Sequence, residues 1–216
     1  MQKKNFNFSR KLLDLAANDL RLLLDIHQPI KERRELEEKE HLQIFFNNHP
    51  IVLCTLAHLV EMSELDVDEM QFEFDLWGNF RCDVGFGNST TNTYCLIELE
   101  GAQKNSLFKN KPKNYPKYSD RLECGYSQII DWFFKIDEIK NTSGIKRRFA
   151  GEYPRVNAVL IIGRSHFLNT DLERNRFNWR RDNTLIGAKN VNCLTYDELL
   201  VYFESKTKEM EDYKTK

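Results

Sequence analysis

Apolar positions in the first part of the chain recur with helical spacing. Residues 10–30 carry a broad apolar face interleaved with charged side chains, which predicts an amphipathic helix. All but one of residues 31–40 are charged, which indicates a solvated connection or exposed helical turns. A second helix is expected through residues 42–46, and it should end before Pro50 because the residue preceding a proline disfavours helix.

The periodicity then changes from helical to alternating. Residues 71–76 and 80–86 each alternate apolar and polar side chains on either side of a short turn, which predicts a hairpin with one buried face. A polar loop leads to a third strand at residues 93–100. The apolar side chains of that strand share one face, whereas Glu98 and Glu100 share the other.

The second half of the chain mixes strands and helices. Residues 156–162 form an almost continuous apolar run, as expected of a strand buried on both faces. A T-x-x-E capping box at Thr195–Glu198 opens the last helix. The other expected segments are an irregular loop at 101–118, a helix at 119–139, a polar and partly basic stretch at 164–190 and a short strand at 191–194. This order of elements predicts an α+β or α/β core.

Composition narrows the class of protein. A chain of 216 residues that is 41% hydrophobic and 30% charged fits one globular domain, or one domain with an appended helical segment. The net charge of -1 argues against a wholly basic coat but leaves room for local basic patches. Five cysteines without a C-x-x-C pair indicate reduced thiols. There is no apolar run of the ~18 residues that a membrane span needs, and no signal peptide opens the chain, so we expect a cytoplasmic protein and no membrane partner.

Three acidic residues are candidates for a metal site. Asp83 and Glu98 fall on the polar faces of neighbouring strands, and Glu100 follows two positions after Glu98, so its side chain should point the same way. Convergent carboxylates repel one another unless a cation lies between them, and hard oxygen ligands suit Mg²⁺ or Mn²⁺. The alternative is that all three are ordinary solvent-facing acids on an amphipathic sheet.

The spacing of these acids resembles the PD-(D/E)xK nuclease superfamily. More narrowly, several segments resemble the nuclease domain of the Shedu anti-phage defence family and together span roughly residues 36–203. They are EKEHLQIFFNNHP (38–50), FRCDVGF (80–86), CLIELEGAQKNSLF (95–108), YSQIIDWFF (126–134), AVLIIGR (158–164) and CLTYDELL (193–200). The resemblance implies an α/β, restriction-endonuclease-like core with a mixed central sheet flanked by helices. It also implies metal-dependent hydrolysis of phosphodiester bonds in bacterial defence, with phage DNA as the nucleic-acid partner.

The resemblance also assigns roles to individual residues. Asp83 and Glu98 would bind the metal ion together with the Leu99 carbonyl, and Gln128 would position substrate or water. Glu38 or Glu40 would match the acid that the superfamily has on its first core helix. The usual lysine of E-x-K is Glu100 here. A glutamate there fits a general base or a further metal ligand, and it also fits a nuclease-fold module that binds nucleic acid or mediates assembly without turnover.

Two basic segments could hold nucleic acid. Lys104, Lys109, Lys111 and Lys113 directly follow the carboxylates, either as a phosphate-binding loop or as a solvated loop. The stretch 164–181 is rich in arginine, and its aromatic residues Phe177 and Trp179 could stack on bases, although we expect them to pack in the core.

The chain is accordingly divided into an N-terminal helical extension at 1–35, a nuclease-like domain at 36–205 and a charged tail at 206–216. The apolar face of the first helix must pack on this domain or on a second subunit. We also expect a homo-oligomer.

Overall fold

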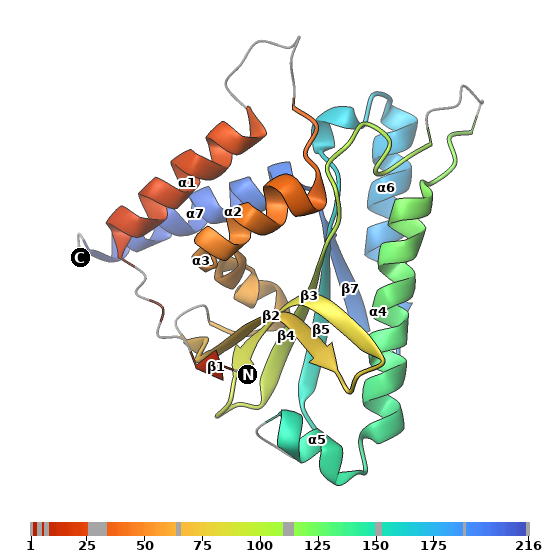
Figure 1. The fold of residues 1–216 in the computed structure, drawn as a ribbon. Coiled ribbons are helices and arrows are strands. Elements are labelled where there is room, and N and C mark those ends of the chain that lie inside the picture. The colour runs from red at the N-terminus through yellow and green to blue at the C-terminus, as the bar shows by residue number, and fades with distance from the viewer. Residues whose placement is uncertain are drawn as a thin grey trace.

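A mixed β-sheet flanked by helices on both faces forms the centre of the molecule, which places it in the α/β class (Figure 1). The computed structural model describes residues 2–3, 6, 9–25, 34–63, 66–109, 115–149, 153–187 and 189–214.

The sheet contains five longer strands and a two-residue strand at each edge of the described part, in the order β1-β2-β3-β4-β5-β7-β6. Strands β1 to β4 are antiparallel neighbours, whereas β4, β5 and β7 run parallel to one another. The strands are β1 (Gln2–Lys3), β2 (Glu69–Leu76), β3 (Phe80–Asn88), β4 (Thr93–Leu99), β5 (Arg155–Ile161), β6 (Leu185–Ile186) and β7 (Lys189–Leu194).

Helices cover the two faces in separate groups (Figure 1). Helices α1 (Arg10–Leu24), α2 (Gln43–Asn48), α3 (Ile51–Cys54) and α7 (Tyr196–Lys214) pack on one face, and α4 (Asp120–Ile139), α5 (Ser143–Arg148) and α6 (Asp171–Asn183) pack on the other. The described residues also include the π-helical turn η1 (Glu38–Leu42) and the 3₁₀ turns η2 (Thr55–Val60) and η4 (Ser165–Phe167). Because both faces are covered, every residue of β4 is buried.

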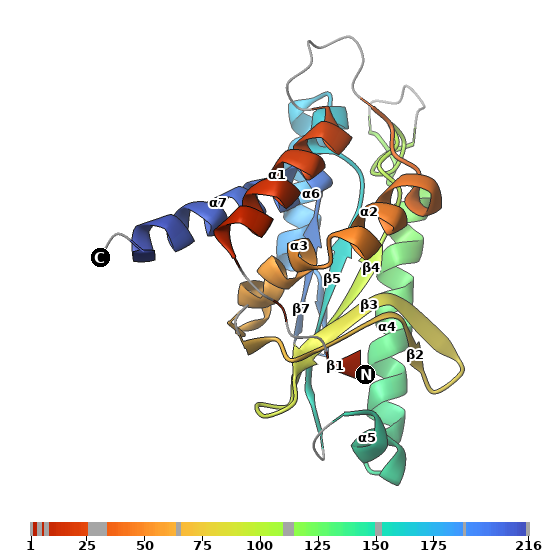
Figure 2. The same cartoon turned by 60° about the vertical axis from the view of Figure 1, so that its left-hand side comes forward.

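The first helix packs against the rest of the chain, as its apolar face predicts. Helix α1 runs alongside α7 (Figure 2), and Arg21 on α1 forms an ion pair with Glu204 on α7. Leu20 and Leu24 are fully buried in the same core as the sheet. The part of the predicted helix at residues 26–30 lies outside the described residues. At the other end of the chain, α7 continues to Lys214 through the segment expected to be a charged tail.

The hairpin is present, but the expectation of one buried face is wrong. Cys82 packs with the core on the α4 side, whereas Val84 packs with the core on the α7 side. Regular pairing of β2 with β3 is interrupted between these positions, where Glu73 adopts a left-handed φ of 49° opposite Asp83. A residue in this conformation twists the strand, so the side chains on either side of it change face.

Several other predicted elements are confirmed. The helix expected at 119–139 is α4, whose N-cap hydroxyl Ser119 accepts a hydrogen bond from the Leu122 N–H. The buried apolar run is β5, a central parallel strand. At the start of α7 the Glu198 side chain accepts from the Thr195 N–H while the Thr195 hydroxyl accepts from the Glu198 N–H, which completes the capping box.

The pattern did not predict the helical segments α3, η2, α5, η4 and α6. None of the described helices is long and apolar enough to span a membrane.

Candidate functional site

The candidate site lies where β3 separates from β4. Antiparallel pairing between these strands ends at Val84, which faces Ile97. One residue beyond that pair, the Asp83 carboxylate turns to the end of β4, and its Oδ2 accepts a hydrogen bond from the Leu99 N–H at 2.7 Å. The strands therefore diverge at Asp83, and the carboxylate occupies the opening between them.

Helix α2 and the turn before it close one side of this opening. The Gln43 side-chain amide donates to Asp83 Oδ1 at 3.3 Å and to Glu38 Oε1 at 3.4 Å, so it joins the two acids. Burial, together with the negative charge of Glu38, raises the pKa of Asp83 to about 6, although the hydrogen bond from Leu99 opposes both effects. Of the two acids proposed for the first core helix, Glu38 is the one that reaches the site.

Glu98 is the most deeply buried acid of the group. Its residue is 7% exposed, and its carboxylate accepts a hydrogen bond from the side chain of Gln128 on α4. Its other oxygen, Oε2, is buried without a hydrogen-bond partner among the described residues. Burial, followed by the charges of Asp83 and Glu100, raises the pKa of Glu98 to about 9. The alternative of three ordinary solvent-facing acids therefore does not hold for Glu98.

Glu100 has one contact at its backbone carbonyl and one at its carboxylate. The hydroxyl of the fully buried Tyr196 donates to the Glu100 carbonyl at 2.8 Å, which ties the start of α7 to the end of β4. The Glu100 carboxylate Oε2 lies 3.6 Å from Nη1 of Arg121 on α4. Burial raises the pKa of Glu100 to about 7, with Glu38 adding to the rise and Arg121 opposing it.

The four acids form one electrostatic cluster, but their side chains have separate partners. Asp83 is held by Leu99 and Gln43, whereas Glu100 is drawn towards Arg121. Within the described part of the chain, no group of three or more histidine, cysteine or acidic side chains is arranged so that it could hold a metal ion. The expected convergence of three carboxylates on one point is thus not seen among the described residues, where Asp83 and Glu100 have different partners.

The donor set nevertheless has the chemistry that a hard divalent cation requires. Carboxylate and carbonyl oxygens are the ligands that Mg²⁺ and Mn²⁺ prefer. The Oε2 of Glu98 is a buried acceptor that has no hydrogen-bond partner in the described residues. The roles of Asp83, Glu98, Leu99, Glu100 and Gln128 in catalysis or metal binding stay predictions.

The lysines expected to bind nucleic acid are placed only in part. Lys104 is exposed, and its backbone N–H donates to Glu35 Oε1 at 2.9 Å. The ammonium of Lys109 forms an ion pair with Asp120, the first residue of α4. Lys111 and Lys113 lie outside the described residues.

The second basic stretch is largely built into the fold. Arg164 is 1% exposed and pairs with Asp197 at 2.9 Å, and Arg180 pairs with Glu123 at 2.6 Å. Core packing is confirmed for Phe177, which is 2% exposed. It is wrong for Trp179, which is 68% exposed because it lies on the outer side of α6.

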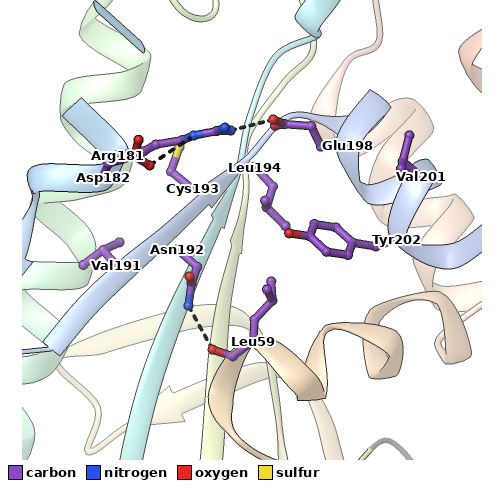
Figure 3. A pocket seen from close by; sticks show the side chains of 10 residues that line it. All are labelled: Leu59, Arg181, Asp182, Val191, Asn192, Cys193, Leu194, Glu198, Val201 and Tyr202. Atoms are coloured by element: carbon purple, nitrogen blue, oxygen red, sulfur yellow. Dashed lines mark hydrogen bonds and ion pairs between the residues drawn. The ribbon is translucent and has the colours of Figure 1, made fainter. Parts of the chain in front are cut away.

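A surface pocket of about 640 Å³ lies elsewhere, between β7, α7 and η2 (Figure 3). Its charged residues are already paired, since Arg181 on its rim donates to Glu198 and also lies beside Asp182. Asn192 donates to the Leu59 carbonyl at 3.3 Å. None of the acids around Asp83 lines this pocket.

Sequence reasoning missed three residues of the site, namely Gln43, Arg121 and Tyr196. They come from three different helices, α2, α4 and α7, so no spacing rule links them to Asp83. Arg121 follows the lysine-rich segment 104–113, and its spacing in the sequence did not single it out. The motif EKEHLQIFFNNHP contains Gln43 and was the one available signal for it.

The fold and the acidic cluster define an α/β protein with a buried carboxylate site at one end of its central sheet. Residues 35–200 match the family described as Shedu protein SduA, C-terminal, and this match covers most of the chain. The chain therefore belongs to that family, and membership suggests a role in defence. No curated protein matches it.

Proposed function

We propose that this chain is a metal-dependent nuclease that hydrolyses phosphodiester bonds of phage DNA in bacterial defence. The observation that carries the proposal is the buried acid cluster around Glu98, whose Oε2 has no hydrogen-bond partner in the described residues. Uncompensated burial of like charges is costly for stability, and such arrangements are concentrated at functional sites. In this proposal the sheet and its flanking helices form a restriction-endonuclease-like core.

Asp83, Glu98 and the Leu99 carbonyl would hold Mg²⁺ or Mn²⁺, because they provide the hard oxygen ligands that these ions select. The bound ion would lower the pKa of a water molecule and stabilise the charge that develops on the phosphate. The chain's own residues prepare the site for this. The Leu99 N–H and Gln43 keep Asp83 at the opening between the strands, and burial excludes bulk water from Glu98.

Two further residues would act on the nucleophile. Glu100 is partly buried with a pKa of about 7, which suits a group that accepts a proton near neutral pH. Gln128 donates to Glu98 from α4, so it would orient that carboxylate or an attacking water. Lys104, Lys109, Lys111 and Lys113 would contribute charge for the phosphate backbone. A cytoplasmic homo-oligomer remains part of the proposal.

A plasmid-cleavage assay tests the proposal. Wild-type protein should cut DNA in Mg²⁺ or Mn²⁺ and stop when EDTA is added. Asp83→Ala should lose cleavage while keeping its fold, since the charge repulsion that it relieves offsets the loss of the hydrogen bonds from Leu99 and Gln43. The matched control is Asp137→Ala, which removes an exposed aspartate that bonds only Tyr153 at the far end of α4 among the contacts described. Equal cleavage by Asp83→Ala and wild type would assign the activity to another site or a contaminant.

A second candidate is a nuclease-fold module that binds nucleic acid or mediates assembly without turnover. It is favoured by Glu100, which stands where the related motif has a lysine, and by the separation of the acids in the described part of the structure. DNA binding by wild type without cleavage in either metal would select this candidate.

A further inference from the structure

Arg121 reaches from the first turn of α4 into the acidic site. Its Nη1 lies 3.6 Å from Glu100 Oε2, and its Nη2 donates to the side-chain oxygen of Gln103 at 3.2 Å. The guanidinium thus lies across the segment that leaves β4. Its side chain is 32% exposed, so it lies at the edge of the acidic site and is not fully buried within it.

The residue between Glu100 and Ala102 leaves room for this guanidinium. A Cβ atom at Gly101 would come within 2.4 Å of Arg121 Nη1 and 3.2 Å of its Cζ. Gly101 does not have the left-handed backbone conformation that favours glycine. The need for a glycine therefore comes from the close passage of Arg121, which is an observation independent of the ion pair.

A cation in this position reduces the repulsion between the acids of the site and an anionic substrate. Glu38, Asp83, Glu98 and Glu100 together repel an approaching phosphate, which is itself an anion. Arg121 lowers the pKa of Glu100 and so offsets part of this negative potential. A guanidinium also presents several N–H donors in a planar fork that matches phosphate oxygens.

We propose that Arg121 is the phosphate-binding residue of the site, and that Gly101 is small so that the guanidinium can pass. The inference rests on the proposed nuclease function, and it names the residue that receives the anionic substrate beside the acids. Arg121 already has an acid and an amide as partners, but the described contacts are a hydrogen bond from Nη2 to Gln103 and an approach of Nη1 to Glu100 at 3.6 Å. A guanidinium has five N–H donors, so donors remain for a phosphate.

DNA binding in EDTA tests this directly, because it requires neither metal nor turnover. Arg121→Gln should weaken binding of a short DNA duplex about tenfold. It should also reduce the slope of log affinity against log salt by about 1, as expected when one phosphate contact is lost. Arg121→Lys should recover part of the affinity. The matched control is Arg155→Gln, which removes an exposed arginine paired with Glu61 at the opposite end of β4 and should change neither quantity.

Gly101→Ala displaces the guanidinium without deleting it. The added methyl would clash only with the far end of a flexible side chain, since its contact with the Leu36 carbonyl at 3.5 Å is an ordinary one, so the variant should fold and melt like wild type. It should nevertheless lose DNA affinity in the same direction as Arg121→Gln. Wild-type affinity in a folded Gly101→Ala would contradict the proposed role of the glycine.

Mn²⁺ affinity separates phosphate binding from a merely structural role. If Arg121 acts through its charge, Arg121→Gln should bind Mn²⁺ as tightly as wild type or several-fold more tightly, because a cation has been removed from beside the acids. If Arg121 only fastens the segment after β4, Mn²⁺ affinity should fall and the salt slope should stay unchanged, and the inference is then overturned.

The outcomes also distinguish this inference from the nuclease proposal. Cleavage by wild type together with undiminished DNA binding and cleavage by Arg121→Gln would overturn the inference and leave the nuclease. Arg121-dependent DNA binding without cleavage would uphold phosphate binding and overturn the nuclease. A wild type that has no affinity for DNA would overturn the role of Arg121, whatever its other activities.

Discussion

Burial of the Glu98 carboxylate lowers the stability of the folded protein. A buried carboxylate normally has enough donors or a cation to replace the water that it loses. Glu98 has the Gln128 amide on one oxygen, and its Oε2 has no partner in the described residues. Three further acids act on it or on its neighbours. We interpret this as stability given up for function, which is common at sites that bind ions.

The pH dependence of stability follows from this burial. The charges of Asp83, Glu100 and Glu38 add to the effect of burial on Glu98, whose folded-state pKa is raised from 4.5 to about 9, while the cation Arg121 acts on the neighbouring Glu100. Between these two values the folded protein binds the proton more tightly than the unfolded chain, so raising the pH favours unfolding. The metal-free wild type should therefore lose stability relative to Glu98→Gln as the pH rises through this window.

Urea unfolding in EDTA at pH 5 and pH 8 measures this effect. Both proteins should be about equally stable at pH 5, where the side chain is neutral in each. At pH 8 the free energy of unfolding of Glu98→Gln should exceed that of wild type by on the order of 1–3 kcal/mol. A wild type that becomes more stable than Glu98→Gln between pH 5 and pH 8 would show that Glu98 has a cationic partner in the folded protein.

Gln128 offers a second test at this scale. Its amide donates to Glu98, and its removal should let that carboxylate rotate without unfolding α4. We expect Gln128→Ala to reduce the cleavage rate about tenfold, in the range found for residues that orient metal ligands. Ser127→Ala, an exposed neighbour on the same helix, is the control. Equal cleavage rates for Gln128→Ala and Ser127→Ala would show that Gln128 has no role in cleavage.

At the scale of elements, the hairpin of β2 and β3 decides where Asp83 points. Alternation alone places Asp83 on the polar face of a regular strand. The left-handed Glu73 interrupts that regularity, and pairing with β4 stops one residue away. A local twist of this kind depends on packing against both helical layers, so the alternating pattern could predict the hairpin and not the change of face.

Helices were predictable where their apolar stripe or cap was strong. Helix α4 carries both signals, since Ser119 caps it and a wide apolar face is buried. Helix α6 buries only Phe177 among its described apolar residues, because its arginines form ion pairs instead. The capping box formed by Thr170 and Glu173 was the signal that could have revealed it.

Helix α1 gives a matched pair of leucines for testing its packing. Leu20 is fully buried against the core, whereas Leu22 on the same helix is 71% exposed. Leu20→Ala should lower the free energy of unfolding by about 2–5 kcal/mol because it leaves a cavity. Leu22→Ala should change it by less than about 0.5 kcal/mol. Chemical denaturation measures both, and similar losses for the two variants would contradict the packing of α1 on this domain.

At the scale of the whole molecule, helices on both sides of the sheet explain why the site is buried. The sequence predicted an amphipathic third strand with a polar face, yet all of β4 is covered. The acids Glu98 and Glu100 could be singled out from their spacing. Their neighbours Gln43, Arg121 and Tyr196 could not, because they come from three helices that meet only when the fold is complete.

The measurement that tests the central claim most directly is the Mn²⁺-dependent cleavage rate of a defined DNA duplex by wild type and Glu98→Gln. The matched control is Glu61→Gln, which removes the charge of an 82% exposed side chain that pairs with Arg155. We predict cleavage by wild type and Glu61→Gln, and loss of at least about a hundredfold in Glu98→Gln. Cleavage by Glu98→Gln at the wild-type rate, or none by wild type in any divalent metal, would contradict the account.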